Sequence, residues 1–62
     1  MAIEQAKGLL AERLGVSTEE AFERLRRYAR SNNQLLAEVS TNLVAGTLPP
    51  RAVDEMRVPR HP

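Results

Sequence analysis

The stretch STEEAFERLRRYAR, residues 17–30, decides the fold class because it carries the start signal, apolar stripe and charge order of an amphipathic helix. Ser17 and Glu20 match a capping box, in which the Ser17 hydroxyl accepts from the Glu20 amide and the Glu20 side chain reaches back. Glutamates come early and arginines late, as the helix dipole favours. The pattern predicts a helix from Ser17 to about Arg30 with this apolar stripe: Ala21, Phe22, Leu25, Tyr28 and Ala29.

A second helix is predicted upstream, from about Ala2 to Leu14. Its apolar residues recur at three- and four-residue steps, which places them on one face. Gly8 lies inside this helix and costs about 1 kcal/mol relative to Ala. A close approach by a neighbouring backbone would explain its presence. Gly15 is well placed to end the helix.

A third helix is predicted downstream, starting near Ser31–Asn33. Ser31 with Gln34 makes a second possible capping box, and Asn32 is an alternative cap. Gly46 ends this helix, and Pro49-Pro50 block its continuation. Its apolar stripe consists of Leu36, Val39 and Leu43.

Together these segments predict an all-α fold, with a three-helix module over residues 1–46 and a Pro-containing tail over residues 47–62. Within the tail, residues 51–56 can form a short helical turn, and residues 58–62 are expected to be disordered. The predicted core comprises Ile3, Ala6, Leu10, Phe22, Leu25, Ala29, Leu36, Val39 and Leu43. The apolar side chains left over, which favour dimerisation, are Leu9, Leu14, Leu35 and Val44.

The composition excludes several classes of protein. A 62-residue chain forms one small domain, for which self-association is the expected reinforcement. It has no cysteine, and His61 stands alone near the terminus, so we expect no disulfide, metal site or cofactor. With one Phe and one Tyr, an aromatic stacking platform is not expected. The net charge of +1 means that attraction to a polyanion depends on where the charges lie.

Membrane insertion and catalysis are not expected either. No apolar run approaches the roughly 20 residues of a membrane span, and the N-terminus does not resemble a secretory signal. A cytoplasmic location follows. The predicted helices carry no histidine or cysteine, and Asp54 and Glu55 lie in the tail, so we expect no enzyme activity.

Residues 3–10, IEQAKGLL, closely resemble the opening of the ANTAR domain family. That family has an Ile, two variable residues, Ala-Lys-Gly and then two aliphatic residues. Further matches follow in register, and the resemblance covers roughly residues 3–44. The further matches to the family are Arg13, Gly15, Glu20-Ala21-Phe22, Leu25-Arg26, Ala29, Asn33, Leu36 and Val39.

The resemblance implies an RNA-binding output domain of a bacterial transcription antitermination regulator. Such domains bind a pair of RNA hairpins with hexanucleotide loops, which prevents formation of a terminator hairpin. They usually act as dimers under the control of a receiver or sensory domain. We therefore expect RNA hairpin loops as the ligand, a homodimer, and a sensory or receiver domain or protein outside this chain.

The chain departs from the family pattern at several positions. Basic residues are common near the start of the third helix, where this sequence has Gln34, Leu35 and Ala37. Ser40 replaces an Ala that often follows the Val, and Ala11 replaces a frequent Met. The coiled-coil helix that normally leads into the domain is missing before the motif. These departures bear on RNA affinity and dimer stability more than on the fold.

A protein that reads an RNA loop needs donors for base edges, cations for phosphates, and small residues where bases approach the backbone. At about 100° per residue, Arg26 and Arg30 lie together at the border of the apolar stripe, and Arg27 points more towards solvent. The candidate donors and cations are Lys7, Arg13, Arg26, Arg30 and Asn33. The candidate small surfaces are Ala6, Gly8 and Ala29.

These assignments have structural alternatives. Lys7 can pair with Glu4, and Asn33 can cap the third helix. Arg26 and Arg30 have no acid four residues earlier, although the helix dipole alone can explain them. The small residues can serve packing. Two other arginines do have an acid four residues earlier, which gives the possible ion pairs Glu20–Arg24 and Glu23–Arg27.

Two other functions remain open. A helix-turn-helix DNA-binding module fits three helices, but its recognition helix would have no Lys or Arg between Gln34 and Ala45. A helical dimerisation or protein-docking module without nucleic acid binding fits the surplus leucines and the near-neutral charge. It predicts a concentration-dependent dimer and no salt-sensitive RNA binding.

Overall fold

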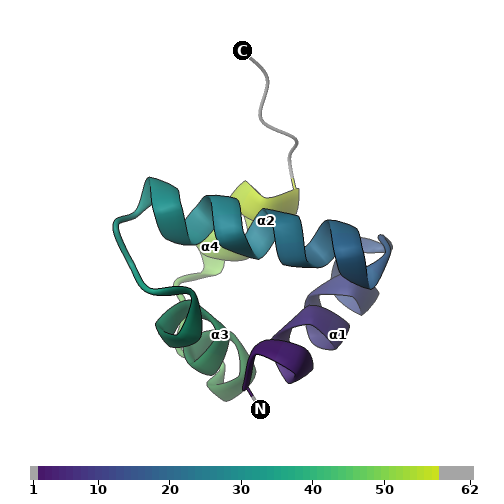
Figure 1. Ribbon diagram of the computed structural model, residues 1–62, viewed down its shortest axis with the longest axis horizontal. Coiled ribbons are helices and arrows are strands. Elements are labelled where there is room, and N and C mark those ends of the chain that lie inside the picture. The colour runs from purple at the N-terminus through teal and green to yellow at the C-terminus, as the bar shows by residue number, and fades with distance from the viewer. Residues whose placement is uncertain (1, 58–62) are drawn as a thin grey trace.

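Four helices make up the computed structural model, which describes residues 2–57 (Figure 1). They are α1 (Ala2–Leu14), α2 (Thr18–Ser31), α3 (Leu36–Ala45) and α4 (Pro50–Arg57). No strand occurs within residues 2–57, and the all-α prediction is confirmed. The predicted count of three helices is wrong, because the expected short turn at 51–56 is a full helix. The expected disorder at 58–62 lies outside the described residues.

The start of α2 follows half of the predicted capping box. Ser17 has extended backbone angles, and its Oγ accepts from the Glu20 amide at 3.1 Å. The Glu20 carboxylate does not return to the cap, because Arg24 Nε donates to it at 2.9 Å. The cap therefore satisfies one free amide of the first turn, and Glu20 contributes instead to an ion pair along the helix.

The connection between α2 and α3 differs from the prediction. Ser31 is the last residue of α2, and α3 begins at Leu36, so the second capping box is wrong. Asn33 has φ +56°, and the Gln34 amide donates to the Ala29 carbonyl at 2.8 Å. Such a left-handed turn satisfies the last carbonyls of a helix, and Asn is one of the few residues that tolerate it. Asn33 therefore ends α2 and does not cap α3.

The other helix ends follow the sequence signals. Gly15 and Gly46 have φ values of +69° and +77°, which end α1 and α3 at the predicted places. The Thr47 amide donates to the Asn42 carbonyl at 2.8 Å and completes the turn after α3.

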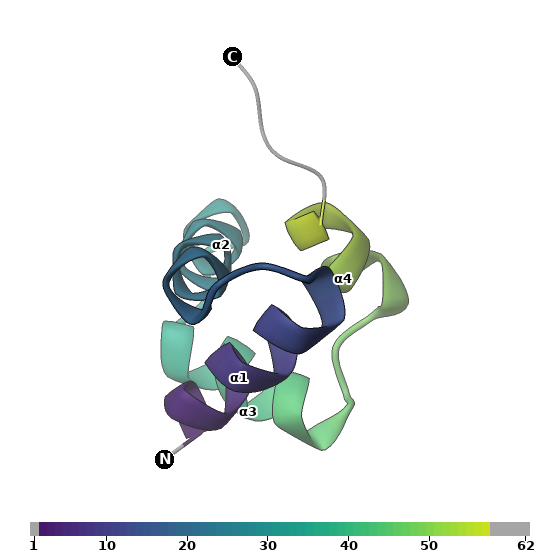
Figure 2. The same cartoon turned by 90° about the vertical axis from the view of Figure 1, so that its right-hand side faces the viewer.

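The core lies where the four helices meet. Helix α1 packs against both α2 and α3, and α4 packs on α2 (Figure 2). The predicted core residues Ile3, Phe22 and Leu36 are only partly buried. Of the apolar residues left over, Leu35 is 69% exposed and Val44 is 41% exposed. The buried apolar residues are Ala6, Leu10, Ala11, Ala21, Leu25, Ala29, Val39, Leu43, Ala52 and Met56.

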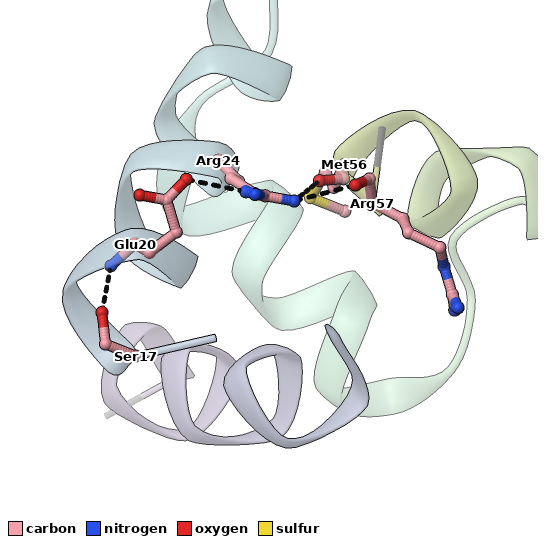
Figure 3. A network of polar contacts seen from close by, with 5 residues as sticks. All are labelled: Ser17, Glu20, Arg24, Met56 and Arg57. Atoms are coloured by element: carbon pink, nitrogen blue, oxygen red, sulfur yellow. Dashed lines mark hydrogen bonds and ion pairs between the residues drawn. The ribbon is translucent and has the colours of Figure 1, made fainter. Parts of the chain in front are cut away.

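Helix α4 depends on contacts with the rest of the chain. It has eight residues, too few for a stable isolated helix. Pro50 suits its first position because the fixed φ of proline is helical and no amide is needed there. Ala52 and Met56 are buried in the common core. At its other end, Arg24 Nη1 donates to the carbonyls of Met56 and Arg57 at 2.8 and 2.9 Å (Figure 3).

Candidate nucleic-acid interface

Helix α2 has two different borders beside its buried face. The buried face is formed by Ala21, Leu25 and Ala29. At about 100° per residue, Phe22, Arg26 and Arg30 follow one border at four-residue steps. Arg24 and Tyr28 lie on the opposite border, and Arg24 is the residue that binds α4. The docked α4 therefore leaves the Phe22 border uncovered.

Lys7 of α1 lies beside the Phe22 border. Its Nζ is 5.6 Å from the centroid of the Phe22 ring, a cation–π distance. It is also 3.4 Å from the Glu4 carboxylate, so the predicted Glu4–Lys7 pair is present. The α1–α2 packing thus places Lys7 beside Phe22, at the start of the row that continues with Arg26 and Arg30. We call Lys7, Arg26 and Arg30 the basic border.

The ion pairs of the basic border are weak. Arg26 Nη2 lies 3.4 Å from Glu23 Oε1, and both side chains are about half exposed. Such surface pairs contribute at most about 1 kcal/mol, so an incoming phosphate can displace the acid. Arg30 is exposed and has no ion pair with residues 2–57. The two arginines of the basic border are therefore accessible to a polyanion.

The remaining arginines of α2 behave differently. The predicted Glu20–Arg24 pair is confirmed, with 2.9 Å between Arg24 Nε and Glu20 Oε2. Glu23 pairs with Arg26 three residues later, and no Glu23–Arg27 pair is found in the described part of the chain. Arg27 is exposed, as expected from its angular position. Arg24 is 17% exposed and occupied on both sides, so it is not free to bind phosphate.

Asn33 follows Arg30 at the end of α2. Its side chain is exposed and makes no hydrogen bond with any residue from 2 to 57. The neighbouring Asn32 uses its Nδ2 to donate to the Tyr28 carbonyl at 2.9 Å. Asn33 therefore combines a backbone role in the turn with an exposed side chain that has no hydrogen bond within residues 2–57.

The other candidate residues are not part of the basic border. Arg13 is exposed in the last turn of α1, about 120° from Lys7 around the helix axis, on the other side of Ala6 and Leu10. Ala6 is 0% exposed and Ala29 is 3% exposed, so neither presents a surface to a ligand in this conformation. Gly8 is exposed, and no heavy atom of the described chain lies within 4 Å of a Cβ built on it. The close neighbour expected at Gly8 is therefore absent from residues 2–57.

Phe22 lies in this region, although its sequence pattern predicted a core residue and not a site residue. It is half-buried, with Lys7 over its ring and Arg26 one turn further along α2. The four-residue step from Phe22 to Arg26 is visible in the sequence. The contact with Lys7 is not visible there, because it depends on how α1 crosses α2.

Other kinds of site find little support in residues 2–57. That part of the chain contains no group of three or more His, Cys, Asp or Glu side chains placed to hold a metal ion. None of the described helices has the length and apolar character needed to cross a membrane.

The fold and the basic border thus define a small helical module suited to a polyanionic ligand. Comparison with known proteins is consistent with this: the family model described as "ANTAR domain" matches residues 1–44 of the 62. The chain belongs to the ANTAR domain family, whose members are regulatory RNA-binding domains and not enzymes. No match was found among curated proteins or solved structures. Helix α4 lies beyond the matched residues.

Proposed function

We propose that this chain is the RNA-binding output domain of a bacterial transcription antitermination regulator, and that it recognises paired hairpins with hexanucleotide loops in a leader RNA. It acts in the cytoplasm as a homodimer. A receiver or sensory domain or protein outside this chain controls it. The basic border binds loop phosphates, and the Asn33 side chain contacts a base edge.

The observation that carries this proposal is the position of Lys7 from α1 over Phe22, the residue with which Arg26 and Arg30 form a row at four-residue steps on α2. Arg26 and Arg30 are one turn apart, about 6 Å along the helix axis. The row of positive charge they form continues onto a second helix at Lys7. Phosphates crowded in a tight RNA loop favour such a row, because each contact releases condensed counterions.

The candidate residues outside the basic border have secondary roles in this proposal. Arg13 makes a separate phosphate contact from the other side of α1. Gly8 offers an open helix surface, where a nucleotide can approach the backbone without meeting a side chain. Ala6 and Ala29 belong to the buried cluster and support the packing of α1 and α2 beneath the basic border.

Protein docking without RNA binding is the second candidate function. The exposed side chains of Leu35 and Val44, at 69% and 41%, favour it. A helix-turn-helix function is less well supported, since α3 (Leu36–Ala45) would be the recognition helix and contains no Lys or Arg.

A matched pair of double variants tests the RNA-binding surface. Arg26→Ala with Arg30→Ala removes two cations of the basic border. Arg27→Ala with Arg51→Ala removes two exposed arginines elsewhere. Affinity for a labelled two-hairpin RNA is measured over a salt series, with circular dichroism to confirm equal helicity. The first pair should lower the slope of log affinity against log salt by about 1.4, from roughly 0.7 per phosphate contact. Equal losses for both pairs would remove Arg26 and Arg30 from the site.

A further inference from the structure

A contact between two side chains links the two halves of the basic border. The Lys7 ammonium lies 5.6 Å from the Phe22 ring centroid, and Arg26 follows Phe22 by one helical turn. Residues four apart on a helix have Cβ atoms about 5–6 Å apart. Phe22 therefore has a cation of α1 over its ring and a cation of its own helix one turn further along.

We propose that Phe22 is a positioning residue of the RNA site, which holds the Lys7 ammonium beside Arg26 so that the two cations converge on one phosphate. This inference rests on the proposed function. The negative face of the aromatic ring attracts the ammonium and offsets part of its repulsion from the arginine. Phe22 itself need not touch RNA.

The exposure of the residues supports a role beyond packing. Ala21 and Leu25 on the same helix are 0% exposed, whereas Phe22 is only partly buried, with its ring in contact with a charged group. The Lys7 side chain is only 25% exposed, which is low for a lysine. Its ion-pair partner Glu4 does not account for this, because the Glu4 side chain is 72% exposed. An exposed pair with Glu4 restrains a lysine weakly, so the contact with the ring adds a second restraint of similar size.

Positioning matters for affinity because an unrestrained lysine loses rotamer freedom when it binds. Ordering such a side chain at an interface costs about 0.5–1.5 kcal/mol, which corresponds to about a two- to tenfold change in affinity. Because the Phe22 contact restrains Lys7 in the free domain, this rotamer freedom is lost on folding and not on binding RNA. Weakening the ring–ammonium attraction should therefore lower RNA affinity without changing the number of phosphates contacted.

The composition of the chain makes the contact directly measurable. Phe22 is the only phenylalanine and Lys7 the only lysine in the sequence. Proton NMR of the full chain without RNA should show a nuclear Overhauser effect between the Phe22 ring and the Lys7 ε-methylene, together with an upfield shift of that methylene. Both signals should disappear in Phe22→Leu. Their absence from the unaltered chain would overturn the positioning role, whatever the RNA measurements give.

The RNA measurement replaces Phe22 biosynthetically with 3,4,5-trifluorophenylalanine, which weakens the π face at nearly constant shape. Affinity for the two-hairpin RNA should fall about two- to tenfold with an unchanged salt slope. Lys7→Met should reduce the slope by about 0.7, and in that background fluorination should have no effect. If fluorination leaves the affinity unchanged, or acts equally without Lys7, this inference is wrong while the proposed function stands. If the unaltered chain binds no RNA, the proposed function fails and this inference with it.

Discussion

Arg24 joins α4 to the rest of the domain, so replacing it should selectively release that helix. Arg24→Met keeps the apolar stem and removes the guanidinium. The variant loses two hydrogen bonds to the carbonyls of Met56 and Arg57, at 2.8 and 2.9 Å, and the 2.9 Å ion pair with Glu20. Charge-assisted bonds are worth about 1.5–3 kcal/mol each when buried, and less here because the Arg57 carbonyl contact is exposed. The helical ion pair adds about 0.3–0.5 kcal/mol.

These contributions predict a loss of about 2 kcal/mol in the free energy of unfolding, or about 8–16 °C in Tm for a domain of this size. Thermal unfolding followed by circular dichroism measures the loss, and amide hydrogen exchange of residues 52–57 shows whether α4 opens first. Arg27→Met is the matched control, because Arg27 is an exposed arginine of the same helix. A Tm change no larger than that of the control would refute the argument that Arg24 fastens α4.

Three further substitutions separate stability from RNA binding. Ser40→Ala should raise the free energy of unfolding by about 1 kcal/mol in chemical denaturation, because the buried Ser40 Oγ has no hydrogen-bond partner in residues 2–57; a loss of stability would show that this hydroxyl is satisfied. Gly8→Ala should stabilise the free domain by up to about 1 kcal/mol, since a Cβ there meets no described atom, yet weaken RNA binding; unchanged affinity in titrations would exclude close approach at Gly8. Asn33→Gly should keep the free energy of unfolding within about 0.5 kcal/mol of the unaltered chain, because Gly accepts φ +56°, and should still lower RNA affinity; equal affinity would leave Asn33 only its backbone role.

Local signals predicted much of the fold. The cap at Ser17 and the left-handed glycines at positions 15 and 46 need only nearby residues, and these helix ends were correct. The start of α3 was wrong because Ser31, Asn32 and Asn33 all suit a cap. The left-handed Asn33 and the hydrogen bond from the Gln34 amide to the Ala29 carbonyl show that this segment ends α2.

Long-range contacts account for what the sequence did not reveal about α4. The Arg24 bonds to α4 join residues 32 and 33 positions apart. An eight-residue helix is too short to be stable in isolation, so its stability comes from Arg24 and from the burial of Ala52 and Met56.

The candidate site was predictable to a similar extent. Periodicity alone places Arg26 and Arg30 on one border of α2. The contact of Lys7 with Phe22 depends on the crossing of α1 and α2, which no local pattern specifies. Small size suggested Ala6 and Ala29 as RNA contacts, but small residues also suit close helix packing, and both are buried.

The most direct test of RNA recognition is binding of the whole chain to a labelled RNA with two hexanucleotide-loop hairpins, compared with a duplex DNA of equal charge over a salt series. The account predicts micromolar or tighter RNA binding that weakens with salt, and much weaker DNA binding. A folded chain that binds neither, or that binds both equally, would contradict RNA recognition by the basic border.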